Sequence, residues 1–212
     1  MRSRLFVVLA VAITVMALGV SAQAGTLAGS KHDLRSTGAS AYKGTSDEIC
    51  LYCHSPHNGS TIAPLWSHQL SAAGGYQAYT STTMSAASNY TSGVSAACLS
   101  CHDGTLATGN LLATVNGGVD IGGIVLGAST ANLGTDFRND HPVGISMTTA
   151  AVGDPTMNGA PTDPTVVRTF INGAITDAVE CASCHRVHDN TIAFFLVKSN
   201  AGSAICISCH AK

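Results

Sequence analysis

The sequence predicts a mostly irregular fold, in which short helices carry a repeated cysteine motif and small β-hairpins lie between them. All eight cysteines fall in four copies of Cys-x-x-Cys-His. Only 10% of the residues are charged and 5% are aromatic, whereas about 25% are charged in a typical globular protein. Because Gly, Ser, Thr and Ala fill the connections, the chain has few large side chains with which to build a core. Something other than side chains must supply the apolar mass.

Residues 1–24 have the three parts of a secretory signal peptide. Two arginines precede an apolar stretch at residues 5–20, and Ala-Gln-Ala at residues 22–24 forms a cleavage site. The alternative is an uncleaved membrane anchor, but the apolar stretch is shorter than the roughly 20 residues that a spanning helix needs. We therefore expect an exported protein, residues 25–212, with no membrane segment in its mature form.

The charge of the chain argues against two classes of partner. The formal net charge is −2, and lysine and arginine together number only 10. Nucleic-acid binding and membrane-surface binding both rely on clusters of basic residues. We expect neither nucleic acid nor a membrane among the partners.

The repeated motif is that of covalent c-type haem attachment. Disulfides, four-cysteine zinc sites and redox dithiols also use paired cysteines, but none of them requires the histidine that follows. Histidine accounts for 9 of 212 residues, so its presence after all four pairs is improbable by chance. We therefore expect four covalently bound c-type haems. The attaching pairs are Cys50 and Cys53, Cys98 and Cys101, Cys181 and Cys184, and Cys206 and Cys209.

The spacing of the motif follows from the chemistry of attachment. Two thiols add to the two vinyl groups on one edge of the porphyrin, and the next residue then lies under the ring. Its imidazole is the proximal iron ligand. The proximal ligands are His54, His102, His185 and His210. The fold class is thus a haem-organised multihaem cytochrome c, with residues 25–212 as a single tetrahaem domain.

The connecting segments give weaker signals. Ser46 and Ser95 precede the first two motifs and are expected to cap short helices there. Residues 71–97 are rich in Ser, Thr, Ala and Gly and are expected to form a surface loop. Apolar runs flank Asn-Gly turns within residues 111–126 and 166–179, which predicts two β-hairpins. Residues 194–197 are expected to form a further strand.

Five histidines remain after the proximal ligands are assigned: His32, His57, His68, His141 and His188. Four irons have four distal positions, so this number predicts two imidazoles on every iron. We expect the distal ligands to be His32, His57, His141 and His188. His68 follows the only tryptophan and is the spare, packed or hydrogen-bonded where it lies.

His57 and His188 each follow a proximal histidine by three residues. The macrocycle prevents such a histidine from reaching the far face of the same haem. It lies about one helical turn further on, so it is expected to bind the iron of a different haem packed alongside. One short segment would thus hold two haems.

The chain resembles a family of exported multihaem c-type cytochromes. The segments that carry the resemblance are CLYCHSPHN, APLWSH, CLSCHDGTLA, NDHPVGI, VECASCHRVH and SNAGSAICISCH. The family includes the tetrahaem and hexahaem cytochromes of metal-reducing bacteria that polymerise into extracellular nanowires. The resemblance implies a continuous chain of haems and a histidine supplied to a haem of the next subunit. His57 is the natural candidate for that ligand, and His141 and His188 match recurrent ligand positions.

These observations favour an electron carrier over an enzyme, because an iron with two imidazoles has no site for substrate. The leading hypothesis is a filament subunit at the cell surface or outside the cell, exchanging electrons with redox partners. One alternative is a soluble periplasmic shuttle. The other is a multihaem reductase with one open iron.

The haem count is tested most simply on the exported protein. Mass spectrometry is expected to give the mass of residues 25–212 plus four haems, and a pyridine haemochrome assay is expected to detect haem c. The mass of the polypeptide alone would contradict the assignment of the motifs.

Overall fold

The computed structural model describes residues 27–71, 75–112 and 122–211. The expected signal peptide lies outside these ranges, and so does the centre of the hairpin expected within residues 111–126. None of the helices in the described ranges is both long and apolar enough to cross a bilayer.

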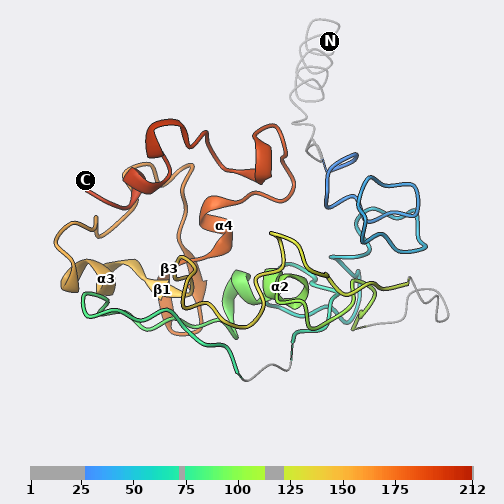
Figure 1. The fold of residues 1–212 in the computed structure, drawn as a ribbon, viewed down its shortest axis with the longest axis horizontal. Helices are drawn as coiled ribbons and strands as arrows, with labels where there is room; N and C mark the ends of the chain where they lie inside the picture. The colour runs from blue at the N-terminus through green and yellow to red at the C-terminus, as the bar shows by residue number, and fades with distance from the viewer. Residues whose placement is uncertain (1–26, 72–74, 113–121, 212) are drawn as a thin grey trace, which may run out of the picture.

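Regular structure occupies a small part of the chain, as the sequence predicts, and turns and irregular segments connect it (Figure 1). The N-terminal segments lie toward one end of the molecule and the C-terminal segments toward the other, with α2 between them. In the described residues, the helices and strands are α2 (Gly93–His102), β1 (Ile145–Ser146), α3 (Met147–Gly153), β2 (Phe170–Asn172), β3 (Ile175–Val179) and α4 (Cys181–Cys184). Three short 3₁₀ helices follow: η1 (Ala193–Phe195), η2 (Ala201–Ser203) and η3 (Cys206–Ser208).

The strands form one antiparallel sheet in the order β1-β3-β2. The turn between β2 and β3 contains Gly173 at φ +58°, a conformation that glycine adopts without steric cost. This confirms the hairpin that Asn172 and Gly173 predict. Because β3 leads directly into α4, the sheet fixes the position of the third cysteine motif.

Three expectations for the connecting segments are wrong. Residues 71–97 are not a surface loop throughout, because Ala86 and Tyr90 are buried and α2 begins at Gly93. Ser95 lies inside α2 and is not its N-cap, which is Ser92. Residues 194–197 form no strand, since Phe194 adopts a φ of 62° within η1.

The first motif also differs from expectation, because residues 49–53 form turns and no helix begins at Ser46. The backbone of Ser46 bonds instead to the Tyr52 hydroxyl, which accepts from its N–H at 3.0 Å and donates to its C=O at 2.9 Å. These two bonds tie the approach segment to the motif and occupy the backbone groups that a helix would use.

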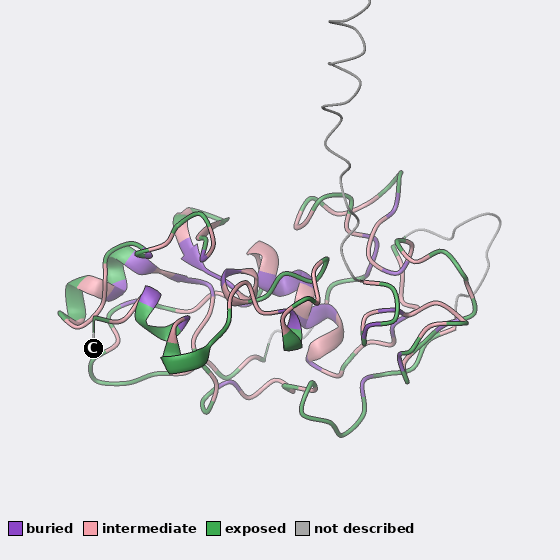
Figure 2. Cartoon of the chain, turned by 90° about the horizontal axis from the view of Figure 1, so that it is seen from above, coloured by how far each residue is buried: buried purple, intermediate pink, exposed green. Residues whose placement is uncertain are grey.

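Apolar burial is limited to small clusters, and Figure 2 shows the buried residues as short runs scattered along the chain. One cluster lies between the sheet and α3, and a second joins α2 to the segments before and after it. The first comprises Ala86, Ile145, Met147, Ala150 and Val179; the second comprises Tyr90, Leu99 and Phe137. Neither cluster reaches all four cysteine motifs, which agrees with the expectation that side chains do not form the main core.

Met147 is the central side chain of the first cluster, with a relative exposure of 0%. Replacing it by alanine leaves a cavity, so Met147→Ala is expected to lower the free energy of unfolding by about 2–5 kcal/mol. The matched control is Val152→Ala on the exposed side of α3, where the side chain is 86% exposed. Chemical denaturation measures both; equal effects would contradict this description of the cluster.

Candidate functional site

The four cysteine motifs share one local backbone arrangement, although they lie in different elements. In three of them the histidine N–H donates to the carbonyl of the first cysteine: His54 to Cys50 at 2.8 Å, His185 to Cys181 at 3.0 Å and His210 to Cys206 at 2.9 Å. The second motif forms the last turn of α2. Each motif is thus one helical turn that presents two thiols and an imidazole together.

None of the eight cysteines forms a disulfide. Burial is the main cause that raises the pKa of Cys53 to about 11, of Cys101 to about 12 and of Cys184 to about 11. Zinc ligands and redox dithiols require the thiolate, which a raised pKa disfavours. Within the part of the chain that the structure describes, no group of three or more His, Cys, Asp or Glu is arranged to hold a bare metal ion.

The thiols of successive motifs lie near one another. After burial, the charge of Cys53 in the first motif is the next cause that raises the pKa of Cys101 in the second. Cys98 hydrogen-bonds to Cys181 in the third motif, which raises the Cys98 pKa and lowers that of Cys181.

The third and fourth motifs are neighbours in the same way. The pKa of Cys184 in the third motif is raised by burial and then by the charge of Cys209 in the fourth. The motifs therefore follow one another in space in the order in which they occur along the chain.

Each of three proximal histidines donates its Nδ1–H to a backbone carbonyl. The acceptors are Pro64 for His54 (2.6 Å), Ala131 for His102 (2.8 Å) and Phe194 for His185 (2.8 Å). This hydrogen bond fixes the ring and its tautomer, and it leaves the lone pair on Nε2 free for a metal.

Three proximal histidines also lie opposite a second histidine. The ring centres are 5.8 Å apart for His102 and His32, 6.0 Å for His54 and His188, and 6.4 Å for His210 and His141. His188 thus lies against the proximal histidine of the first motif and not against that of its own, third motif.

These separations fit a shared iron. Two imidazoles bound to opposite faces of one metal have ring centres roughly 6 Å apart, because each metal–nitrogen bond is about 2 Å long. The Nδ1 of His32 is buried without a hydrogen-bond partner in the structure. Burial, followed by the charges of His102 and His185, lowers the His32 pKa to about 4, which favours the neutral, metal-binding form. The residues present therefore fit bis-histidine haem.

Two of the predicted ligands have no such partner. Among the residues that the structure describes, neither His185 nor His57 has a ring contact with another histidine. His57 is exposed, and its carbonyl accepts a hydrogen bond from Ser55 Oγ. The sequence does not pair particular distal histidines with particular irons; the structure brings three proximal histidines close to three of the other histidines and leaves His185 and His57 without such a contact.

His68 is fully buried and occupied by backbone groups. Its Nδ1 lies 2.9 Å from the carbonyl of Gln69, and its Nε2 lies 2.8 Å from the carbonyl of Ala107. Both nitrogens of His68 thus face backbone carbonyls. Because Ala107 follows the second motif, the contact with its carbonyl joins the segment after the first motif to the segment after the second. This arrangement is that of a structural residue.

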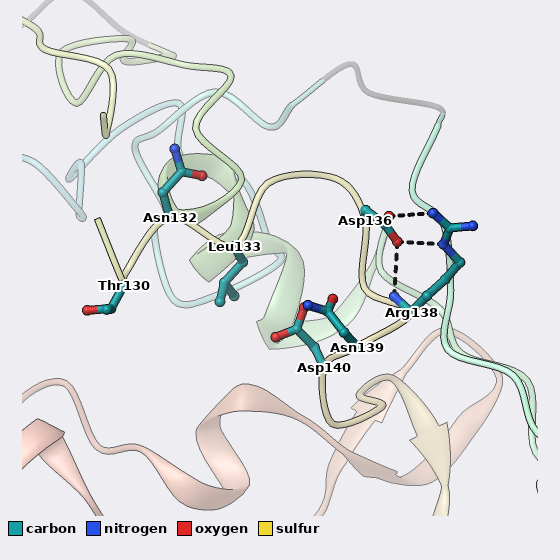
Figure 3. Close-up of a pocket in the computed structure, with 7 residues that line it drawn as sticks. All are labelled: Thr130, Asn132, Leu133, Asp136, Arg138, Asn139 and Asp140. Carbon is teal, nitrogen blue, oxygen red and sulfur yellow. Dashed lines mark hydrogen bonds and ion pairs between the residues drawn. The ribbon is translucent and has the colours of Figure 1, made fainter. Parts of the chain in front are cut away.

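A pocket lies on the loop between Ala131 and His141, and its lining carries no cysteine or histidine. Figure 3 shows its polar lining, in which Arg138 forms a two-pronged contact with Asp136. That contact lowers the pKa of Asp136 to about 2. The contact between Arg138 and Asp136 lies in the loop from Ala131 to His141 and joins two residues of that loop. The carbonyl of Ala131 accepts a hydrogen bond from His102.

Several groups that build the site have no signature in the sequence. The carbonyls of Pro64, Ala131 and Phe194 orient proximal histidines, but a backbone carbonyl has no residue-type signal. Phe195 packs its ring against His32 with centres 4.6 Å apart. The apolar residues 194–197 predict a strand, and a strand would not indicate a contact between Phe195 and His32.

Comparison with known proteins supports the interpretation of the motifs at a coarse level. Residues 173–212 match a protein family described as "Doubled CXXCH motif". The match includes the third and fourth motifs and the segment that joins them. A search of curated proteins found no match. The family match supports a haem-binding c-type cytochrome, which carries electrons through covalently attached haem.

The assignment of His68 is tested by replacing it. His68→Asn is expected to leave every haem low-spin, while lowering the free energy of unfolding by about 1–3 kcal/mol because a buried hydrogen bond is lost. The matched variant His32→Asn is expected to convert one haem to high spin. Absorption and electron paramagnetic resonance spectra measure the spin state; a high-spin haem in His68→Asn would show that His68 is a ligand.

Proposed function

We propose that the chain is a tetrahaem c-type cytochrome that transfers electrons, with imidazole ligands on both faces of its irons. The observation that carries this proposal is the pairing of three proximal histidines with three others at ring-centre separations of 5.8–6.4 Å. A chance arrangement of surface histidines would not repeat one separation in three places, each time with a member of a Cys-x-x-Cys-His motif.

A c-type haem, when bound, supplies reversible one-electron chemistry at its iron. The residues of this chain set the conditions for it. The paired thiols would hold the haems, the backbone carbonyls orient three of the proximal imidazoles that would bind iron, and the distal histidines would supply the further imidazole ligands. Histidine on both faces favours lower reduction potentials than histidine with methionine.

The order of the motifs in space supports a linear path for electrons. Thiols of the first and second motifs, of the second and third, and of the third and fourth interact with one another. Because attachment places the edge of a porphyrin at each thiol pair, successive haems would lie edge by edge in chain order. An electron carrier needs such closely spaced redox centres, whereas an enzyme needs an open site for substrate.

We also propose that the protein is exported and assembles with copies of itself into a filament. The support is the pair of histidines left apart, His185 and His57. His185 has its Nδ1 fixed on Phe194, and His57 is exposed. A second copy that supplies His57 to the iron of His185 would complete the set. The small net charge of −2 limits repulsion between copies.

The same observation favours a second candidate function. If no second copy supplies a ligand, the iron of His185 has an open face on which a small oxidised substrate could bind. The protein would then be a multihaem reductase. A soluble periplasmic shuttle would have the same haems, but it needs neither a ligand from a second copy nor an open iron. It would remain monomeric with four low-spin haems.

The filament proposal is tested by replacing His57. His57→Ala is expected to change one of the four haems from low to high spin and to abolish filaments, because the ligand between subunits is lost. Electron microscopy and gel filtration measure assembly, and electron paramagnetic resonance measures the spin state. The matched control is His141→Ala, which removes a distal histidine inside the subunit and is expected to give one high-spin haem in intact filaments.

The outcomes separate the three candidates. Filaments and four low-spin haems in His57→Ala would contradict the proposed role of His57. A wild-type protein that is monomeric with one high-spin haem would favour the reductase. A wild-type monomer with four low-spin haems would favour the shuttle.

A further inference from the structure

The haem-bearing helices α2 and α4 meet at one buried carboxylate, that of Glu180, whose relative exposure is 1%. One oxygen accepts from the backbone N–H of Ser95 at 2.9 Å, and the other accepts from Asn172 Nδ2 at 2.7 Å. The carboxylate also accepts from the backbone N–H of Ser183. Ser95 belongs to the first turn of α2 and Ser183 to the first turn of α4, so a single side chain caps both helices.

The bonding between the two helices is reciprocal. Ser95 Oγ accepts from the N–H of Cys181 at 2.9 Å, which caps α4 from α2. Ser183 Oγ accepts from the N–H of Glu180 at 3.0 Å, which completes a capping box within α4. The second and third motifs are therefore held together by polar contacts around Glu180, next to the hydrogen-bonded pair Cys98 and Cys181.

The residues around Glu180 leave space for its carboxylate and hold its hydrogen-bond donor in place. Gly93 has a φ of +71°, and a Cβ at that position would lie 2.6 Å from the Glu180 carboxylate. Asn172 is held in turn by Asn89, whose carbonyl accepts from Asn172 Nδ2 at 3.0 Å, and by Ser92. Any side chain at position 93 would displace the carboxylate, and the asparagine that donates to it has little freedom to turn away.

The hydrogen bonds to the carboxylate all come from N–H donors, on Ser95, Asn172 and Ser183. No ion pair of Glu180 occurs among the described residues. The negative charge of Glu180 acts to raise the pKa of both neighbouring attachment cysteines, Cys98 and Cys181. A buried anion without a cation partner interacts strongly with nearby charges, because the surrounding medium has a low dielectric constant.

We propose that Glu180 is a shared positioning residue for the second and third haems, whose negative charge, paired with no cation among the described residues, lowers the reduction potentials of both relative to the first and fourth. The inference rests on the proposed tetrahaem function. An oxidised haem carries one more positive charge than a reduced haem, so a fixed anion stabilises the oxidised form. Because the same side chain caps α2 and α4, the two haems are held in place by the group that sets their potentials.

The test uses the haem-loaded protein and the variant Glu180→Gln, which keeps the shape of the side chain and removes its charge. The chain has one other glutamate, the exposed Glu48, and Glu48→Gln is the matched control. Nuclear magnetic resonance during a redox titration resolves the individual haems. In Glu180→Gln, the haems attached at Cys98 and Cys181 are expected to shift to higher potential, with the other two moving less. Glu48→Gln is expected to shift neither of these two haems appreciably.

Two results would overturn the inference while leaving the proposed function intact. One is unchanged potentials in a Glu180→Gln protein that retains four low-spin haems. The other is an equal shift of all four haems, which would report a global change and not a local charge. The proposed function itself would be contradicted by a different measurement, namely the absence of haem from the unmodified protein.

A second measurement covers the case in which Glu180→Gln does not load haem. In the Glu48→Gln protein Glu180 is the only glutamate, so ¹³C-glutamate, supplied with unlabelled δ-aminolevulinate, glutamine and aspartate to keep the label out of the haem propionates and other carboxylates, labels the Glu180 carboxylate. Infrared difference spectra between oxidised and reduced protein are expected to show the band of an ionised labelled carboxylate changing as the second and third haems are reduced. A spectrum with no labelled carboxylate band would contradict the inference.

Discussion

The structure depends on the single helical turn that joins the first cysteine of each motif to its histidine. The hydrogen bond from the histidine N–H to the first cysteine carbonyl, 2.8–3.0 Å long in three motifs, brings two thiols and one imidazole to one place. This turn recurs in an irregular segment, in an α-helix and in a 3₁₀ helix. The requirement is therefore local, and the rest of the chain is free to vary around it.

Between these turns, the chain relies on polar contacts more than on apolar packing. Glu180, Asn172, Ser95 and His68 are all nearly or fully buried, and each is satisfied by a specific partner. Buried polar groups are costly unless they are paired, so such a network favours one arrangement of the segments. Small residues assist it, as at Gly93, where a side chain would displace the Glu180 carboxylate. This accounts for a composition that is rich in Gly, Ser and Ala and poor in charged and aromatic residues.

The sequence predicts those features whose causes are local. The covalent chemistry of haem requires adjacent residues, and the turn at Asn172 and Gly173 is a property of two residues, so both could be read directly. Glu180 gave no such signal, because its role arises from Ser95 in a helix 85 residues earlier in the chain. The carbonyl of Phe194 and the burial of Tyr90 likewise follow from tertiary contacts. The position of Ser95 before the second motif predicts that it caps its own helix, but its hydroxyl caps the neighbouring one.

We propose that attached haem, and not a side-chain core, maintains this fold. The most direct measurement is amide hydrogen exchange on the polypeptide produced without haem attachment, compared with the haem-loaded protein. The account predicts that α2 and β3 are protected only when haem is attached, and that the polypeptide alone shows no cooperative thermal unfolding. Equal protection and equal unfolding in the two forms would contradict it.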